Sequence, residues 1–217
     1  MGLFFLKILV VFFFFAEYLQ PLFKRLFDIF ASFFGILILL PFFIIIIFLM
    51  IVTSGFPIFY LQTRVGRNGR DFKLFKFRTM HTNADKKGLL TVGGHDPRVT
   101  KIGYYLRKYK LDELPQLFNV LFGTMSLVGP RPEVRKYVDL YTNEQQKVLS
   151  VRPGITDFAS LEFINENDLL AKSANPEQTY INDIMPAKLN LNAKYIEQHG
   201  LLFDFKIIMK TILKIVQ

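Results

Sequence analysis

The chain has no cysteine among its 217 residues, and this absence excludes both a disulfide framework and a thiolate metal site. Tryptophan is also absent, although phenylalanine occurs 25 times. No internal repeat and no low-complexity linker divides the sequence. A chain of this length is sufficient for one domain of ordinary size together with a membrane segment.

Acidic residues are in the minority, with 18 Asp and Glu against 27 Lys and Arg, and the formal net charge is +9. Such a surplus is typical of proteins that bind nucleic acid, and also of proteins that handle phosphate substrates at an anionic membrane surface. The basic residues follow or flank apolar segments, and the sequence contains no nucleic-acid recognition motif. The pattern therefore favours a membrane and phosphates over nucleic acid.

Charge is missing altogether from residues 29–52, a run long enough to cross ~30 Å of hydrocarbon as a helix. Pro41 lies near its middle and is expected to kink such a helix. Lys24 and Arg25 precede the run, and the basic residues after it are Arg64, Arg67, Arg70, Lys73, Lys76 and Arg78. Because positive charge marks the cytoplasmic flank, both ends are predicted on one side. A re-entrant hairpin bent at Pro41 satisfies this pattern, and an ordinary kinked transmembrane helix is the alternative.

Residues 1–20 form an apolar extension whose longest uncharged run, residues 8–16, is too short to span a membrane. A cleaved signal peptide is a weaker interpretation, because no pair of small residues marks a cleavage site after the run. We expect an interfacial helix packed beside the main anchor.

A β-hairpin is predicted over residues 57–79, since two β-prone segments flank the turn signal Gly-Arg-Asn-Gly at 66–69. Lys76 and Arg78 share one strand face and could present two cations to a phosphate; a purely structural hairpin is the alternative. A loop is predicted over 82–97 and a helix over 98–109. This helix carries Arg107, five residues before Asp112.

Two adjacent acids, Asp112 and Glu113, open an apolar segment with helical spacing over residues 111–121. Acids in the first turn of a helix are common and usually inert, which is one interpretation. The other is chemical, because a carboxylate pair near the arginine of the rigid Gly-Pro-Arg-Pro turn at 129–132 suits a metal-assisted attack on a phosphate ester. Spacing alone does not decide between them.

The rest of the chain is predicted to be mainly helical. A helix is expected over 133–150, a rigid turn over 151–156, and a polar, acidic segment in solvent over 162–183. The last helix, 201–216, is amphipathic, with a stripe formed by Lys206, Lys210 and Lys214. It suits an interfacial helix on anionic lipid, or a helix docked on the body with its lysines outward. The fold class is therefore α+β, mostly helical, with a small β-hairpin and interfacial amphipathic helices.

Four blocks resemble the bacterial sugar transferase family, the monotopic polyprenyl-phosphate phosphoglycosyl transferases, over about residues 22–216. The blocks are Phe23-Lys24-Arg25-Leu26-Phe27-Asp28; Phe75-Lys76-Phe77-Arg78-Thr79-Met80; Leu111-Asp112-Glu113-Leu114-Pro115-Gln116-Leu117-Phe118-Asn119-Val120 with Ser126-Leu127-Val128-Gly129-Pro130-Arg131-Pro132-Glu133; and Val151-Arg152-Pro153-Gly154-Ile155-Thr156. Their order and spacing match the family throughout.

This resemblance implies an enzyme that moves a sugar-1-phosphate from a UDP-sugar to a polyprenyl (undecaprenyl) phosphate and releases UMP. Asp112 corresponds to the nucleophile, which forms a phosphosugar intermediate. Glu113 corresponds to the second acid of the dyad, and the two acids would hold Mg²⁺. Lys76, Arg107 and Arg131 correspond to the cations around the phosphates.

The resemblance also implies a re-entrant membrane hairpin, at 21–56, and a cytosolic catalytic domain, at 57–217, so that with the extension at 1–20 the chain has three predicted parts. The expected location is the bacterial inner (cytoplasmic) membrane with the catalytic domain facing the cytoplasm, in the first membrane step of glycan assembly. Membrane lipid is an expected partner and nucleic acid is not, while homo-oligomerisation is left open.

Two departures from the family pattern matter. The family commonly has Ser-Pro at the hairpin bend, where this chain has Leu40-Pro41, and Gly-Trp-Ala-Gln where this chain has Asp157-Phe158-Ala159-Ser160. The sugar and the pathway (capsule, O-antigen, exopolysaccharide or glycoprotein) therefore stay open. A catalytically silent membrane scaffold and a hydrolase of the same donor are the competing hypotheses.

Overall fold

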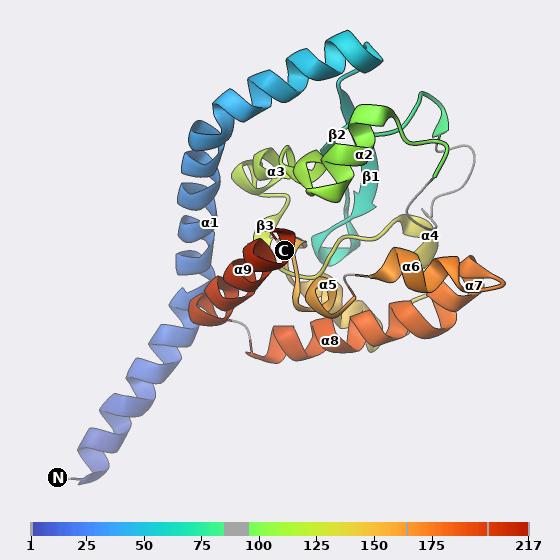
Figure 1. Ribbon diagram of the computed structural model, residues 1–217. Coiled ribbons are helices and arrows are strands. Elements are labelled where there is room, and N and C mark those ends of the chain that lie inside the picture. The colour runs from blue at the N-terminus through green and yellow to red at the C-terminus, as the bar shows by residue number, and fades with distance from the viewer. Residues whose placement is uncertain (1, 85–95, 164, 199, 217) are drawn as a thin grey trace.

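The computed structural model describes residues 2–84, 96–163, 165–198 and 200–216. The fold is mostly helical with two small sheets, which confirms the predicted class in its coarse features, while the re-entrant hairpin and the interfacial helices remain predictions. Most of the predicted loop at 82–97 lies outside the described residues. One long helix runs along the side of a body built from short helices and strands (Figure 1).

Helix α1 extends from Gly2 to Ser54 and contains Pro21 and Pro41. Its ribbon changes direction along its length (Figure 1), as expected where proline removes a backbone hydrogen bond. Residues 2–20 continue into this helix, so the expected separate helix beside the anchor is not observed. By length and composition, the part Leu19–Ser54 is apolar enough to cross a membrane, with a hydropathy of 3.3. The backbone of α1 stays helical through Pro41, with no turn between two separate helices. The re-entrant path through the membrane therefore remains a prediction.

The predicted hairpin is confirmed. Strands β1 (Phe59–Val65) and β2 (Asp71–Phe77) pair antiparallel, with Tyr60 opposite Lys76. The short helical turn η1 (Arg67–Gly69) joins them, and Asn68 and Gly69 have φ values of 57° and 71°. These residue types tolerate positive φ, which is why the local sequence signalled the turn.

Helix α2 (Lys101–Lys108) lies within the predicted span 98–109, and the hydroxyl of Thr100 caps it by accepting from Gly103 N at 3.0 Å. The predicted continuous helix over 111–121 is wrong. A single turn, η3 (Leu111–Glu113), is followed by the separate helix α3 (Gln116–Phe122). Pro115 accounts for the break, because it has no N–H to continue the hydrogen bonding of the first turn. The acid pair therefore lies on a short turn of its own.

A second sheet consists of two parallel strands, β3 (Ser126–Val128) and β4 (Gly154–Thr156). The chain leaves β3 directly into the Gly-Pro-Arg-Pro turn. A Cβ at Gly129 would lie 2.4 Å from the Arg152 carbonyl oxygen, and one at Gly154 would lie 2.2 Å from Gly129 N. Both positions therefore need glycine so that the two segments can pack closely.

The single helix predicted over 133–150 is wrong. Two short helices, α4 (Arg135–Val138) and η4 (Gln145–Ser150), occupy this region. Thr142 and Gln145 exchange hydrogen bonds between backbone and side chain at 3.0 and 3.3 Å, an arrangement like a capping box that starts a new helix.

The C-terminal part is a series of helices beyond β4. They are α5 (Phe158–Glu162), α6 (Glu166–Ala171), α7 (Pro176–Thr179), the π-helical η5 (Tyr180–Ile184), α8 (Met185–Gln198) and α9 (Leu201–Val216). The segment 162–183 was expected to lie in solvent, but Leu170 and Tyr180 are buried in the main core with Tyr137. A second core joins α1 to the body, where Phe43 packs against Phe77 and Phe118 with ring centroids 5.6 and 6.0 Å apart.

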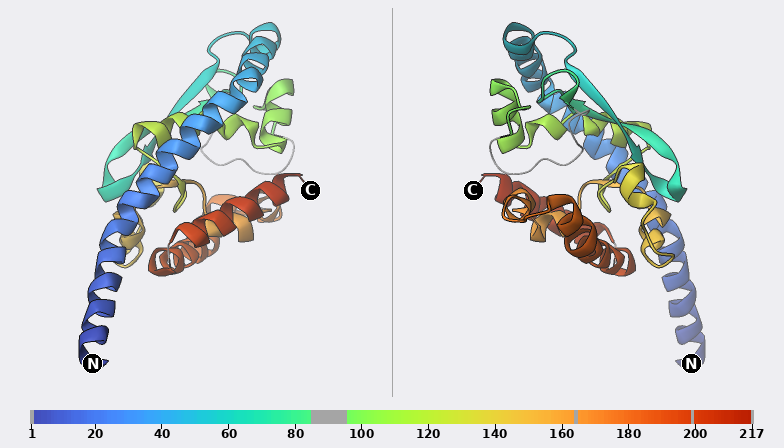
Figure 2. Two further views of the ribbon diagram at one scale, coloured as in Figure 1. Left: turned by 90° about the vertical axis from the view of Figure 1, so that its left-hand side faces the viewer. Right: turned by 90° about the vertical axis from the view of Figure 1, so that its right-hand side faces the viewer.

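Helix α9 has the predicted limits and a mixed environment. Asp204 and Ile207 are buried against the body, which agrees with docking. Leu202 is 90% exposed and Phe205 is 56% exposed, which docking alone does not explain. Figure 2 shows α9 on the same face of the molecule as α1.

Candidate active site

Glu113 is held between two cations. Lys76 Nζ donates to its Oε1 at 3.1 Å, and Arg131 donates to both carboxylate oxygens, including a 3.2 Å contact from Nη1 to Oε2. The three residues come from β2, η3 and the loop after β3. The structure therefore brings together three of the five predicted site residues in one half-buried ion cluster.

The charges in this cluster shift one another's pKa. Burial acts to raise the pKa of Glu113, but the charges of Arg131 and Lys76 outweigh it and hold this pKa well below its usual range. Glu113 in turn raises the pKa of Arg131. Burial lowers the pKa of Lys76, while the Glu113 charge opposes the change. We infer that Glu113 is ionised and is fixed by the cluster.

Asp112 differs from its neighbour. Its side chain is buried, yet within the described part of the chain no group donates a hydrogen bond to it or forms an ion pair with it. Burial raises the pKa of Asp112, and the charge of Glu113 adds to this rise, while Lys76, Arg107 and Lys110 lower it. A carboxylate without a partner, surrounded by positive charge, is free to attack or bind an incoming group.

Arg107 lies in the last turn of α2 and acts on Asp112 through its charge. The phosphate-binding role predicted for it remains a prediction. Lys110 lowers the pKa of both acids, but sequence reasoning did not identify it as a site residue. Its position two residues before Asp112 could have indicated this role.

Of the two interpretations of the hairpin face, the structural one holds for Arg78, which does not lie beside Lys76 as a second free cation. Its guanidinium donates to the carbonyl oxygens of Ser54 and Gly55, each at 2.7 Å, and of Phe56 at 3.3 Å. The last carbonyls of a helix have no intrahelical partner, so Arg78 closes the end of α1. Its charge is consequently engaged there and not at the acid pair.

The loop that carries Arg131 is held by residues that sequence reasoning did not place in the site. Arg64 donates to Pro132 O at 3.0 Å and to Glu133 Oε2 at 3.3 Å. The hydroxyl of Tyr180 donates to the other oxygen of Glu133 at 2.5 Å. Arg64 had been recognised only as part of the basic flank. Its contacts join residues 68 and 69 positions apart, which no local pattern reveals.

Helix α1 contacts α3 and β3, the two elements that follow the acid pair in the chain. Arg25 donates to Val120 O at 2.7 Å and Leu121 O at 3.1 Å, at the end of α3. Asp28 accepts from Leu127 N in β3 at 3.1 Å. The first resemblance block thus attaches the apolar helix to α3, which follows the acids, and to β3, which precedes the Arg131 loop.

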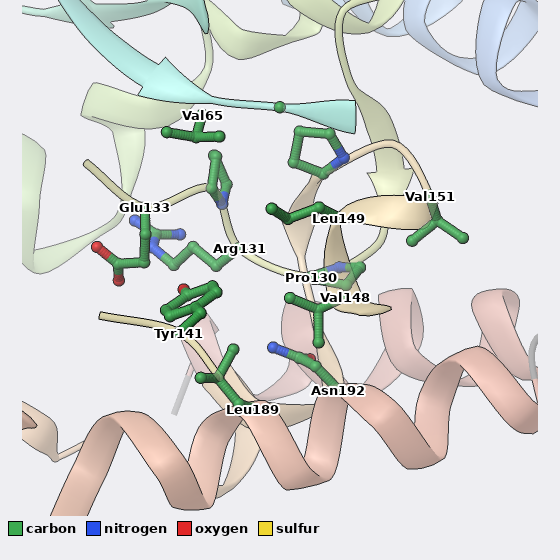
Figure 3. Close-up of a pocket in the computed structure, with 13 residues that line it drawn as sticks. Val65, Pro130, Arg131, Glu133, Tyr141, Val148, Leu149, Val151, Leu189 and Asn192 are labelled. Carbon is green, nitrogen blue, oxygen red and sulfur yellow. The ribbon is translucent and has the colours of Figure 1, made fainter. Parts of the chain in front are cut away.

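A small cavity lies behind the Arg131 loop (Figure 3). Its volume of about 20 Å³ is room for one water molecule. Asn192 lines it, and the Oδ1 atom of that residue is buried without a hydrogen-bond partner. The cavity is too small for a nucleotide, so it belongs to the support of the loop.

Among the described residues, no group of three or more His, Asp or Glu side chains is arranged to hold a metal ion. The adjacent pair Asp112 and Glu113 still suits Mg²⁺. This ion typically binds through one or two carboxylates together with waters and substrate phosphates. Asp112 has unpartnered oxygens, and a carboxylate offers about four acceptor sites, of which the donors to Glu113 use three.

Asp112 is an unpaired carboxylate among several cations, on a body attached to an apolar helix. This arrangement suits a protein that handles anionic groups near a membrane surface. The chain belongs to the bacterial sugar transferase family, whose model matches residues 19–217. The resemblance found in the four sequence blocks is therefore confirmed.

Several curated relatives are similar over most of this chain. A UDP-N-acetylgalactosamine-undecaprenyl-phosphate N-acetylgalactosaminephosphotransferase of Aeromonas hydrophila is 37% identical over 192 residues, which are 87% of this chain and 42% of the relative. An uncharacterized sugar transferase, EpsL, of Bacillus subtilis is 38% identical over 88% of this chain and 86% of its own length. A UDP-glucose:undecaprenyl-phosphate glucose-1-phosphate transferase of Klebsiella pneumoniae is 35% identical over 90% of this chain and 40% of the relative. The chain thus spans less than half the length of the first and third of these relatives.

Proposed function

We propose that the protein transfers a sugar-1-phosphate from a UDP-sugar to a polyprenyl phosphate at the membrane, through a phosphosugar intermediate on Asp112. The observation that carries this proposal is the asymmetry of the acid pair, in which Glu113 is held by Lys76 and Arg131 while Asp112 has no partner among the described residues. The names of the Aeromonas and Klebsiella relatives support the same acceptor and the same type of transfer.

In the first step, an Asp112 carboxylate oxygen attacks the β-phosphorus of the donor. The bond between this phosphorus and the bridging oxygen breaks, and UMP leaves with that oxygen. The nucleophile and the diphosphate are both anionic, so the positive charges of Lys76, Arg107 and Arg131 are needed to bring them together. Mg²⁺, when bound by Asp112, Glu113 and the phosphates, would neutralise further charge on the phosphate oxygens.

In the second step, a phosphate oxygen of the polyprenyl phosphate attacks the same phosphorus. The bond to Asp112 breaks, the carboxylate is regenerated, and a polyprenyl diphosphate sugar leaves. The acceptor keeps its tail in the bilayer and its phosphate at the surface. A body fixed to an apolar helix is suited to meet it there, on the cytoplasmic side of the inner membrane.

The experiment is UMP release from a panel of UDP-sugars by detergent-solubilised protein with Mg²⁺, with and without undecaprenyl phosphate. We expect one preferred sugar and sustained turnover only with the lipid. Asp112→Asn should abolish turnover, while Asp139→Asn should not, because Asp139 is exposed and, among the described residues, its carboxylate pairs only with Arg135, at 4.0 Å. Sustained release without lipid would indicate a hydrolase, and no release with any sugar would favour a silent scaffold.

A further inference from the structure

An open cleft lies between helices α8 and α9, separate from the acid pair. Its volume is about 290 Å³, close to the lower end for small-molecule sites. Its floor is apolar, with the rings of Tyr195 and Phe203 stacked at 6.0 Å and Phe158 packed 6.1 Å from Phe203. The other lining residues are Lys194, Gln198, Lys206, Ile207 and Lys210. The lining contains three lysines and no acid.

The three cleft lysines have free charge. All are exposed, and none forms an ion pair or hydrogen bond with another described residue. Two other lysines, by contrast, have acidic partners, since Lys136 pairs with Glu177 and Lys188 pairs with Glu166. Three unpaired ammonium groups around one apolar floor form a site for an anion that also has an apolar part.

The exposed apolar residues of α9 lie next to this lysine row. Residues three and four apart share a helix face, so the apolar side chains form one stripe beside the lysines. The members of the stripe are Leu202, Phe205, Met209, Ile212 and Leu213, which are between 42% and 90% exposed. An apolar stripe bordered by lysines is the pattern of a helix that lies in a membrane interface.

The position of α9 connects the cleft to the membrane segment. Asp204 of α9 forms an ion pair with Lys24, and Lys24 lies in the part of α1 that could cross a membrane. The hydroxyl of Tyr195 donates to Asp204 Oδ1 at 2.7 Å, which ties α8 into the same junction. Helices α1 and α9 face the viewer in the left panel of Figure 2. Helix α9, which lines the cleft, is therefore joined to the basic end of the apolar helix, where headgroups would be found.

We propose that this cleft binds the phosphate headgroup of an anionic phospholipid, with the acyl chains beside the apolar stripe of α9. The lysines contact the phosphate, and the aromatic floor contacts the glycerol and upper acyl carbons. The inference rests on the membrane attachment in the proposed function and not on the transfer reaction. Its ligand is a bilayer lipid, distinct from the donor and the acceptor.

The test uses the absence of tryptophan from the chain. Phe205→Trp places a single tryptophan in the apolar stripe, and its emission is measured in nanodiscs that contain a small fraction of brominated phosphatidylglycerol or brominated phosphatidylcholine. Each lysine near an anionic surface strengthens binding roughly fivefold, so brominated phosphatidylglycerol should quench several-fold more at equal mole fraction. In 1 M salt, where the Debye length is ~3 Å, the preference should shrink.

Lys206→Gln with Lys210→Gln, in the reporter background, should make the two lipids quench alike. Lys147→Gln with Lys172→Gln removes the same charge from exposed positions outside the cleft and should leave the preference intact. Equal quenching by both lipids in the parent reporter, or no quenching by either, would overturn the proposal. Loss of the preference on adding inorganic phosphate or UMP would also overturn it, since the ligand would then be a free phosphate. Co-purification with nanodiscs and UMP release, measured on the same samples, report membrane attachment and transferase activity separately.

Discussion

Asp112 and Glu113 are neighbours in the chain but have different surroundings, and this difference carries the functional argument. A buried carboxylate is costly unless cations or donors compensate its charge. Glu113 has that compensation from Lys76 and Arg131, whereas Asp112 has only the field of nearby cations. The first acid is thus suited to chemistry and the second to holding the cations in place.

Arg131→Ala should lower kcat/KM for UMP release by about 10²–10³, the loss typical when one charge-stabilising donor is removed. The donor KM should rise as well, because a phosphate contact is lost and Glu113 keeps only Lys76. Steady-state kinetics with the preferred donor provide the measurement. Arg135→Ala is the control, since Arg135 is exposed and pairs with Asp71, and it should stay within about twofold of wild type. Unchanged kcat/KM in Arg131→Ala would contradict its assignment.

The pH dependence of the first step should reflect the raised pKa of Asp112. The nucleophile is the ionised form, which predominates above the pKa and is lost as pH falls through it. The burst of UMP should therefore decline at a pH above the usual range for aspartate. Lys76→Met removes a charge that lowers this pKa, so the decline should move to higher pH. Rapid-quench measurements of the burst across pH test this, and an identical acid limb in both proteins would refute it.

At the scale of elements, α1 acts as a support for the site as well as an apolar anchor. Arg25 and Asp28 hold the end of α3 and strand β3, and Arg78 on β2 closes the C-terminal end of α1. Strand β2, which carries Lys76, and the elements next to Glu113 and Arg131 are therefore all attached to one helix. Movement of α1 relative to the body would separate these residues.

Arg78→Met should destabilise the protein by about 2–4 kcal/mol, because the carbonyl of Ser54 at the end of α1 and those of the next two residues lose a charged donor. Arg78→Lys should recover part of this loss, since it keeps the charge without the fork. Thermal unfolding in detergent measures the effect. Arg70→Met serves as the control, as Arg70 is exposed. Equal stability of Arg78→Met and Arg70→Met would contradict the role of Arg78.

Elements that a local sequence pattern specifies were predicted correctly. Elements whose limits depend on one residue that breaks a helix were not. The residue types of Asn68 and Gly69, which tolerate positive φ, correctly indicated the hairpin turn. Pro115 could have indicated the helix break, but the helical spacing of the apolar residues around it favoured one continuous helix. The roles of Arg64 and Arg78 depend on contacts with Glu133 and Ser54, which are distant in sequence and appear only in the fold.

At the scale of the whole molecule, a strongly basic body is joined to one long apolar helix. Many large side chains of that helix are exposed, among them Phe30, Ile38 and Phe48, at 60%, 71% and 64%. Exposure of this extent in water would be unfavourable, which supports contact with lipid. The re-entrant path of the helix through the bilayer is predicted from the charges that flank it.

Single cysteines can test this path, because the chain has none of its own. Leu22→Cys and Phe56→Cys lie at exposed positions on either side of the uncharged run. A re-entrant hairpin predicts that a membrane-impermeant maleimide labels both only in inside-out vesicles. Lys147→Cys on the body should label from the same side as a control. Labelling of the two positions from opposite sides would show a transmembrane helix instead.

The central claim is the covalent step on Asp112, and intact-mass spectrometry of the protein incubated with its preferred UDP-sugar and Mg²⁺, without acceptor, tests it most directly. The account predicts one added sugar phosphate per chain, mapped to Asp112, with one equivalent of UMP released and loss of the adduct when undecaprenyl phosphate is added. Asp112→Asn should show neither the adduct nor the burst. Full turnover by Asp112→Asn, or an adduct on another residue, would contradict the account.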